Sequence, residues 1–262
     1  SGNYLAALKA IRSTDHGTTW SAPVAIASVL AVGTRDPQTG KTIRTGAGMG
    51  DIAVGPAGNL YVVWQDSRFS GGRRDGIALS QSTDGGLSWS APVEINAVPS
   101  TQAFTPSITV LSNGTLAVTY YDFRNDTANP STLVTDLWET LSADGVTWHE
   151  RHVSGPFNLD LAPDAEGLFL GDYQGLATDG TDPFPFFVRT VSDATGPTDV
   201  FAFPPALSAP VMMAISQGYA GRPARSYRLT DPVRRRIGEN LRRLVRHEAH
   251  RPRPPFRQSS PD

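Results

Sequence analysis

Two short motifs place an aspartate and an arginine two positions apart, each directly after a segment rich in aromatic residues. The first pair is Asp66 and Arg68, and the second is Asp122 and Arg124. An arginine presents a planar fork of donors that matches a carboxylate, so these arginines could clamp an anionic ligand. A salt bridge repeated at equivalent positions of two structural units would use the same residues. The sequence alone leaves both interpretations open.

Further polar residues stand in or just after long loops. Arg44 could join such a clamp, although a solvated loop charge would explain it equally simply. Asp172 and Tyr173 belong to the segment GDYQG, residues 171–175, where a loop enters an expected strand. Asp51 stands at the equivalent entry to another expected strand. The structural alternative for Tyr173 is a packed aromatic ring with a hydrogen-bonded hydroxyl.

A repeated turn motif separates these loops. Copies begin at Ser13 (STDHGTTW) and Ser82 (STDGGLSW), and a copy one residue shorter begins at Ser142 (SADGVTW). A short aspartate side chain can accept hydrogen bonds from turn amides, and glycine permits positive φ. The motif contains no nucleophile or proton shuttle held in a cleft. We therefore predict that each copy locks a hairpin and that its tryptophan starts the next strand and covers apolar surface.

The elements around each turn predict four short antiparallel strands. Strand-like segments follow that order in residues 51–95 and again in residues 106–153, and a further unit begins at residue 172. Residues before 30 resemble the last two strands of another unit. Four-stranded units at a period of roughly 50–60 residues are the signature of a propeller blade. We predict an all-β fold over residues 1–204, a partial β-propeller of about three and a half blades, with a β-sandwich as the competing fold.

The composition excludes several classes of protein. The chain has 25 glycines, 21 prolines and no cysteine, which excludes a disulfide scaffold and a thiolate metal site. No run of about 18 apolar residues predicts a membrane span. We expect no metal or cofactor, because the HExxH, DxDxDG and phosphate-loop patterns are absent. The sequence starts inside a strand-like pattern, so we expect N-terminal blades outside it.

The C-terminal part of the sequence has a different charge. Residues 1–204 carry 11 basic and 21 acidic residues, whereas residues 205–262 carry 12 arginines and 4 acidic residues. We predict a basic, partly helical tail with a disordered end, in which Asp231 caps the helix and Pro232 occupies its first position. A helix docked on the acidic strand-rich part is favoured over contact with an anionic surface. No aromatic residues are interleaved with the arginines, so we expect no nucleic-acid partner.

The segments LYVVWQDSR, STDGGLSWSAPV, VTYYDFRND and FLGDYQGLA together resemble secreted bacterial proteins of the sialidase-like family, whose propellers carry BNR repeats, or Asp-boxes. The resemblance covers residues 1–204. It implies a glycan substrate, an extracellular or cell-envelope location and exo-acting hydrolysis of sialylated or related acidic glycans. The alternatives are a non-catalytic carbohydrate-binding or interaction propeller and a pure scaffold. Nothing in the sequence defines an oligomeric state.

The resemblance also implies where the site lies and which residues form it. In this family the site is near the axis, on the face opposite the repeated turns, where the long loops 32–51, 65–75, 122–132 and 154–172 emerge. Sialidases use a tyrosine nucleophile, which implies Tyr173 in that role. Its base would be Glu166 or Glu139, and Asp51 would be the acid/base group.

Three arginines hold the sugar carboxylate in this family. The candidates here are Arg44, Arg68 and Arg124, and the carboxylates beside them are Asp66, Asp122 and Asp172. The family's Arg-Ile-Pro motif, which supplies one of the three, is absent from this sequence. We expect that motif in the missing N-terminal blades.

Overall fold

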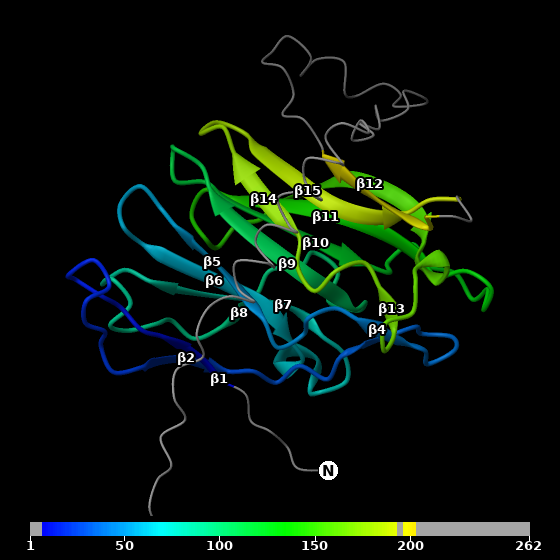
Figure 1. Ribbon diagram of the computed structural model, residues 1–262, viewed down its shortest axis with the longest axis horizontal. Helices are drawn as coiled ribbons and strands as arrows, with labels where there is room; N and C mark the ends of the chain where they lie inside the picture. Colours follow the sequence, from blue (N-terminus) through cyan, green and yellow to red (C-terminus); the bar gives the residue numbers. More distant parts are fainter. Residues whose placement is uncertain (1–6, 193–195, 203–262) are drawn as a thin grey trace, which may run out of the picture. The chain divides into compact units, whose positions relative to one another are not determined.

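The computed structural model describes residues 7–192 and 196–202, where the regular structure is almost entirely β-strand (Figure 1). Two complete sheets contain four antiparallel strands in sequence order, which confirms the predicted repeating unit. The first sheet consists of β5 (Gly50–Val54), β6 (Leu60–Asp66), β7 (Gly76–Ser82) and β8 (Val93–Glu94). The second consists of β9 (Ala103–Val110), β10 (Leu116–Asp122), β11 (Val134–Ser142) and β12 (His149–Asn158).

Partial sheets flank these two along the chain. The pair β1 (Ala7–Ala10) and β2 (Val24–Ser28) precedes them, and β14 (Gly175–Thr178), β15 (Pro183–Thr190) and β16 (Thr198–Ala202) follow them. The predicted basic tail, residues 205–262, lies outside the described residues. The described residues hold no helix that is both long and apolar enough to span a membrane.

Each central sheet is covered on both faces, as strand β6 shows. Successive side chains of a strand point to opposite faces of the sheet. Val62 and Trp64 pack with Val29, in the segment that follows β2. Val63, between them, packs instead with Val118 and other residues of the second sheet. The sheets therefore pack in series, and the two-layer sandwich that competed with this arrangement is wrong.

A larger apolar core joins the second sheet to the third. It is rich in aromatic rings, and Tyr121 stacks on Phe104 with 5.5 Å between ring centroids. Phe187 and Phe201 face it from the third sheet and lie 5.9 Å apart. The hydroxyl of Tyr121 donates to the carbonyl of Val188 at 2.6 Å, so this buried tyrosine links the two sheets by a polar contact as well.

The long links between sheets contain short strands, although the sequence predicted only polar loops there. β3 (Thr34–Arg35) and β4 (Thr42–Arg44) form a hairpin within one link, and β13 (Leu168–Phe169) of the other link pairs with β4 in parallel. A Cβ on Gly167 would meet the Thr42 carbonyl oxygen at 2.8 Å, so only glycine permits this approach. Single 3-10 turns, η1 (Arg68–Ser70) and η2 (Leu159–Leu161), complete the loops.

The three repeated turns share one hydrogen-bond pattern. In the second copy, Asp84 Oδ1 accepts from the amides of Leu87 and Ser88, both at 2.9 Å, while the hydroxyl of Ser82 donates to the same oxygen at 2.8 Å. The first and third copies bind their own amides in the same way through Asp15 and Asp144. Such bonds favour the ionised carboxylate: they hold the pKa of Asp15 at about 2 and lower the pKa of Asp84.

The predicted role of the turn tryptophans needs correction. β8 begins at Val93 and not at Trp89, because Pro92 has no amide to donate to a strand partner. Trp89 and Trp148 are half-buried against the cores, but Trp20 is 59% exposed. In the first and second copies the indole also lies beside the turn glycine, where a Cβ added to the glycine would be 3.9 Å from the ring.

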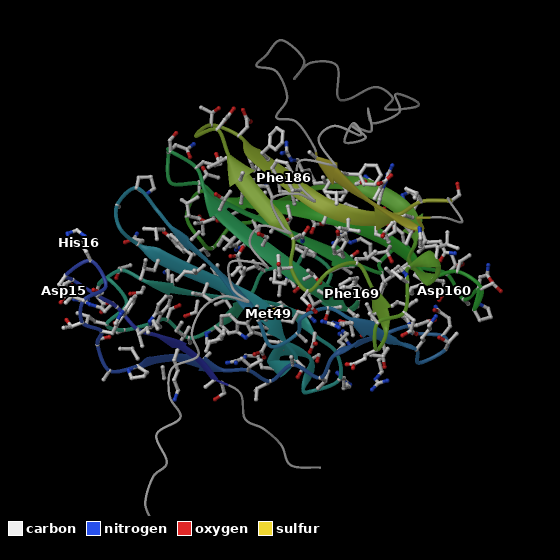
Figure 2. All side chains as sticks on the ribbon, viewed as in Figure 1. Asp15, His16, Met49, Asp160, Phe169 and Phe186 are labelled. Atoms are coloured by element: carbon white, nitrogen blue, oxygen red, sulfur yellow. The ribbon has the colours of Figure 1, made fainter. Side chains whose placement is uncertain are left out.

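The first repeated turn lies at one end of the described chain. Figure 2 shows Asp15 and His16 there, Met49 and Phe169 of the two links nearer the middle, and Asp160 of the second link toward the opposite side.

Replacing Asp84 by asparagine tests the turn as a stability element. We expect the thermal midpoint at pH 7 to fall by a few degrees, because a neutral amide oxygen accepts the turn's hydrogen bonds more weakly. Since the folded pKa of Asp84 is lowered, its contribution exists above about pH 4 and disappears as the pH falls through the folded value. Thermal melts from pH 7 to pH 2 should show the two proteins converging at acid pH. Asp160→Asn is the control. The Asp160 carboxylate lies 3.8 Å from Lys41 Nζ and belongs to no repeated turn, so this variant should melt as the parent does.

Candidate functional site

A β-bulge in β9 organises the region where the links meet the sheets. The pairing of β9 with β10 shifts register around Thr105 and Pro106. The backbone of Thr105 has φ 50°, in the left-handed region that β-branched residues seldom adopt. Backbone strain of this kind persists only where surrounding contacts hold it, and it gathers at functional sites.

Three segments from elsewhere in the chain hold this bulge. The amide of Thr105 donates to Gln65 Oε1 at 3.1 Å, and its hydroxyl donates to the Thr45 carbonyl at 3.2 Å. Its own carbonyl accepts from Gln174 Nε2 at 2.5 Å. The bulge therefore joins β6, the first link and the GDYQG segment in one hydrogen-bonded unit.

A pocket of about 250 Å³ opens at this bulge, and we call it the bulge pocket. Its lining includes three residues singled out from the sequence, namely Asp51, Asp172 and Tyr173. The full lining is Thr45, Gly46, Met49, Gly50, Asp51, Thr105, Pro106, Asp172, Tyr173 and Gln174. A second hollow of about 270 Å³ shares Thr105, Tyr173 and Gln174 with it and adds apolar side chains such as Phe186 and Leu170.

Asp51 is anchored by the strand beside it. Its Oδ2 accepts from the hydroxyl of Ser107 at 2.7 Å and from the amide of Ile108 at 2.9 Å, both on β9. These bonds tie the first strand of one sheet to the first strand of the next. The carboxylate is therefore fixed in position at the pocket, with Oδ1 bonded to the neighbouring Ile52 amide at 2.9 Å.

Arg44 and Asp172 form a two-pronged ion pair between the links. Arg44 Nε lies 2.9 Å from Asp172 Oδ1, and a terminal nitrogen lies 2.8 Å from Oδ2. The guanidinium also covers the ring of Phe169, with 4.6 Å from Cζ to the ring centroid. Hydrogen bonding to Arg44 lowers the pKa of Asp172, so the aspartate is ionised at neutral pH.

The side chain of Tyr173 is free in this structure. It is 79% exposed, and no hydrogen bond to its hydroxyl is found among residues 7–192 and 196–202. The structural alternative of a packed ring with a bonded hydroxyl is therefore wrong. A free phenol beside a fixed ion pair is available to a ligand.

The two glutamates considered as partners of Tyr173 lie elsewhere. Glu166 is exposed in the turn before β13, and no hydrogen bond joins it to Tyr173. Its negative charge contributes to the raised pKa of Arg44. Glu139 is fully buried in β11 and pairs with Arg151 of β12 at 2.5 Å. Burial raises the pKa of Glu139, and this glutamate does not line the bulge pocket.

The two aspartate–arginine motifs form salt bridges within their own loops. Arg68 Nε lies 2.8 Å from Asp66, and Arg124 Nε lies 2.6 Å from Asp122. Arg124 also pairs with Glu150 and lies 3.8 Å above the ring of Trp138. These contacts match the repeated structural salt bridge, and neither arginine lines the bulge pocket.

Each buried aspartate of these motifs binds an indole as well. Trp64 Nε1 donates to Asp66 at 2.8 Å, and Trp138 Nε1 donates to Asp122 at 2.9 Å. Burial opposes ionisation of Asp66, but hydrogen bonds, chiefly from Arg68, outweigh it and leave its pKa lowered. Burial dominates at Asp122, whose pKa is raised. All three nitrogens of Arg124 donate to protein groups, and Arg68 binds Asp66 and the Ser28 carbonyl through Nε and Nη2. In this geometry Asp66, Arg68, Asp122 and Arg124 therefore form structural salt bridges and not a clamp that is ready for a ligand.

Sequence reasoning missed Gln174 and Thr105. Gln174 lines the bulge pocket and the hollow of about 270 Å³ beside it. It also lines a third hollow, between β5, β9 and β14. Its Oε1 is buried and has no hydrogen-bond partner among the described residues. The signal for Gln174 was its place inside GDYQG. Nothing local in the sequence marks Thr105, since the bulge depends on partners 40 to 69 residues away. In the described part of the chain, no three histidine, aspartate or glutamate side chains gather as metal ligands.

No family model and no curated protein matches this sequence. Solved structures do match, at 16–18% identity. The Hadza microbial sialidase Hz136 has a TM-score of 0.36, with 64% of this chain and 36% of that one covered. An alpha-L-arabinanase of Penicillium chrysogenum, complexed with arabinobiose, has a TM-score of 0.40, covering 70% and 52%. The GH93 alpha-L-arabinofuranosidase of Fusarium graminearum also has a TM-score of 0.40, covering 75% and 53%. This chain thus spans about a third to a half of their length.

Replacing Thr105 by glycine and by alanine tests whether the bulge is strained. Both changes remove the hydroxyl that donates to the Thr45 carbonyl, but only glycine relieves the left-handed backbone. We expect the free energy of unfolding of Thr105→Gly to exceed that of Thr105→Ala by about 1 kcal/mol. At Thr109, the matched control in β9, glycine should instead be less stable than alanine by about 0.5–1 kcal/mol. Urea unfolding measures the four variants, and glycine less stable than alanine at Thr105 would contradict the strained bulge.

Replacing Arg44 by methionine tests the ion pair while keeping an apolar stem on Phe169. Without the guanidinium, the pKa of Asp172 should rise toward its ordinary value, and a ¹³C NMR titration of the aspartate carboxyl carbons measures the change. Arg12→Met removes the same charge from an exposed site near the repeated turns and should leave Asp172 unaffected. An unchanged pKa of Asp172 in the Arg44→Met variant would mean that the ion pair is not formed in solution.

Proposed function

We propose that this chain is part of a sialidase-like β-propeller glycosidase that removes terminal sialic acid or a related acidic sugar from glycans outside the cell or at its envelope. The observation that carries the proposal is that Asp51, Asp172 and the exposed Tyr173 line one pocket. A strained bulge fixes that pocket on rigid strands, which is how catalytic geometry is usually held.

The serial packing of the sheets supports the propeller. Each blade of a propeller needs a neighbour on both faces. The sheet of β14, β15 and β16 exposes Val200 at 63% and Phe186 at 41%, and the turn between β1 and β2 exposes Trp20 at 59%. Further blades covering these outer faces would complete the ring and surround the inner strands β5, β9 and β14.

The proposed reaction uses Tyr173 as nucleophile. Its oxygen attacks the anomeric carbon as the bond to the leaving sugar breaks, Glu166 takes the phenol proton, and Asp51 protonates the leaving oxygen. Water then attacks the anomeric carbon and gives a proton to Asp51, which frees Tyr173 to recover its proton from Glu166. Asp51 must exchange its Ser107 hydrogen bond for the sugar oxygen, and the turn carrying Glu166 must approach the phenol.

Arg44 is the proposed contact for the sugar carboxylate. Two of its nitrogens bind Asp172, and another lies 3.5 Å from the Ala165 carbonyl, a long contact that a ligand could replace. Asp172 would then hold the guanidinium plane in position. Arg68 and Arg124 play no part in this proposal, because their own loops engage them.

A non-catalytic glycan-binding propeller is the second candidate. The observation that favours it is that both pocket aspartates are already bonded, Asp51 to β9 and Asp172 to Arg44. Carboxylates held in this way orient a ligand readily but transfer protons only after rearrangement. The two candidates differ in turnover and not in binding.

Turnover of a fluorogenic sialoside by the full-length protein tests the enzyme proposal. We expect Tyr173→Phe to lower kcat/KM by at least about a hundredfold, since the nucleophile is removed. Tyr61→Phe, which deletes the same atom from β6, is the control and should retain activity. Sialyllactose binding without turnover in the parent would support the binding protein instead. Neither binding nor turnover, or equal activity in both variants, would refute the proposed function.

A further inference from the structure

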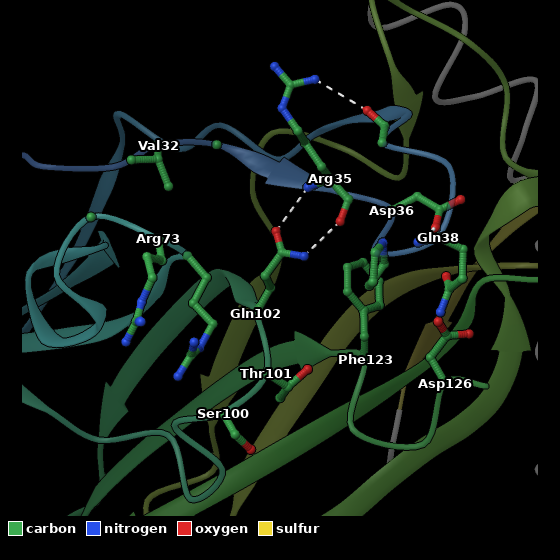
Figure 3. Close-up of a pocket in the computed structure, with 15 residues that line it drawn as sticks. Val32, Arg35, Asp36, Gln38, Arg73, Ser100, Thr101, Gln102, Phe123 and Asp126 are labelled. Atoms are coloured by element: carbon green, nitrogen blue, oxygen red, sulfur yellow. Dashed lines mark hydrogen bonds between the residues drawn. The ribbon is translucent and has the colours of Figure 1, made fainter. Parts of the chain in front are cut away.

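A second cavity, separate from the bulge pocket, lies among the loops (Figure 3). Its volume is about 530 Å³, and it shares no lining residue with the bulge pocket. We call it the arginine cleft. Its lining is Val32, Gly33, Arg35, Asp36, Pro37, Gln38, Gly40, Gly72, Arg73, Arg74, Ser100, Thr101, Gln102, Phe123 and Asp126.

Buried polar contacts fix the walls of this cleft. The carboxylate of Asp75, fully buried, accepts from the amides of Val32 at 2.8 Å and Gly33 at 3.0 Å. Gln102 pairs with the backbone of Arg35 in both directions, with its oxygen 3.0 Å from the amide and its nitrogen 2.7 Å from the carbonyl. A site with walls set in advance loses little entropy when a ligand binds.

Two consecutive arginines stand at the cleft with their terminal nitrogens free. Arg73 Nε donates to the Ser70 carbonyl at 3.0 Å, and Arg74 Nε donates to the Pro99 carbonyl at 2.8 Å. These bonds hold each guanidinium by its inner nitrogen. Within the described ranges, neither arginine has a carboxylate within 4.0 Å or a hydrogen bond from a terminal nitrogen. This contrasts with Arg44, Arg68 and Arg124, which all have carboxylate partners.

The acidic residues of the cleft do not neutralise these arginines. Asp36 is 3% exposed, and its carboxylate accepts from the amides of Gln38 and Thr39 in its own turn. Asp126 accepts from the Val134 amide at 2.8 Å. Figure 3 shows Arg73 at one end of the cleft and Asp126 at the other, with Ser100, Thr101 and Gln102 between them.

We propose that the arginine cleft is a second binding site, for a carboxylate-bearing sugar residue of an acidic glycan. The sugar carboxylate binds the terminal nitrogens of Arg73 and Arg74, which form a pair of planar forks suited to it. Hydroxyls of the same sugar exchange hydrogen bonds with Ser100 and Thr101, which line the same cleft. A simple anion would use only the arginines, whereas an acidic sugar would also bind these two hydroxyls.

This inference is independent of the proposed hydrolysis. Because no residue is common to the cleft and the bulge pocket, the cleft can bind a glycan whether or not Tyr173 is a nucleophile. Multiple weak sites on one protein raise its effective affinity for a polymer. The cleft would hold the chain to an acidic polysaccharide while the bulge pocket engages a chain end.

Binding of trigalacturonate to the full chain tests the proposal, with galactotriose as its neutral counterpart. Amide shifts in ¹H–¹⁵N NMR locate the site, and calorimetry gives the affinity. We expect trigalacturonate to shift the amides of Gly33, Gly72 and Gln102. Galactotriose should bind at least about tenfold more weakly, because it cannot form the charged hydrogen bonds.

Substitutions at the two arginines show whether trigalacturonate binds in the cleft. The double variant Arg73→Ala/Arg74→Ala should weaken trigalacturonate binding by about tenfold or more. The affinity of Arg73→Lys/Arg74→Lys should lie between those of the double-alanine variant and the parent, because lysine keeps the charge but lacks the planar fork of donors. Arg12→Ala, the charge control, and Tyr173→Phe should bind as the parent does. Each variant's thermal melt checks folding.

Several outcomes would overturn the proposal. Unchanged binding in a folded double-alanine variant would do so, as would equal affinity for galactotriose or shifts confined to Gly46, Gly50 and Gln174 at the bulge pocket. Inorganic sulfate that competes fully with trigalacturonate at equal concentration would reduce the cleft to a simple anion site. Loss of sialoside turnover in Tyr173→Phe with trigalacturonate binding intact would leave this proposal standing.

Discussion

The left-handed backbone at Thr105 is the constraint on which the candidate site depends. The bulge turns the Thr105 amide toward Gln65 and its carbonyl toward Gln174, so that one residue binds two segments that no sheet would bring together. The first link also crosses the second closely, since a Cβ on Gly46 would clash with the Asp172 carbonyl oxygen. If the bulge relaxed to a regular strand, these contacts would be lost, and Thr105 and Gln174 would no longer line the bulge pocket together.

The same residue types serve opposite purposes at different points of this fold. Arg68 and Arg124 donate to buried aspartates that also bind tryptophan, and such pairs define geometry more than they add stability. Arg44 is likewise paired but is 41% exposed at its side chain. Arg73 and Arg74 have only backbone carbonyls as partners within the described residues. The arginines therefore differ in their partners: Arg68 and Arg124 bind buried carboxylates, Arg44 binds a partly exposed one, and Arg73 and Arg74 bind backbone carbonyls.

The sequence predicted those parts of the fold that local rules determine. Short runs rich in β-branched and aromatic residues predicted strands such as β6 and β10, and the Ser–Asp–Gly spacing predicted the hairpin turns, because each depends on residues within about ten positions. The link strands β3, β4 and β13 were missed because two or three residues carry no periodicity, and the partner of β13 lies in another link. For the same reason the sequence pointed to Asp51, Asp172 and Tyr173 but not to the Thr105 bulge that gathers them, and it could not show that Arg68 and Arg124 were already engaged.

The division between turns and links also explains why two cavities can coexist on one scaffold. A repeated turn closes on itself, so its hydrogen bonds end within the motif and leave nothing for a ligand. A link must instead cross from one sheet to the next, and its amides are bound by side chains of other units, as Asp75 binds Val32 and Gly33. Each crossing leaves space between the segments that it joins. The bulge pocket and the arginine cleft both border the first link. Gln65 connects them, because it accepts from the Thr105 amide at the bulge and donates to Asp75 at the wall of the cleft.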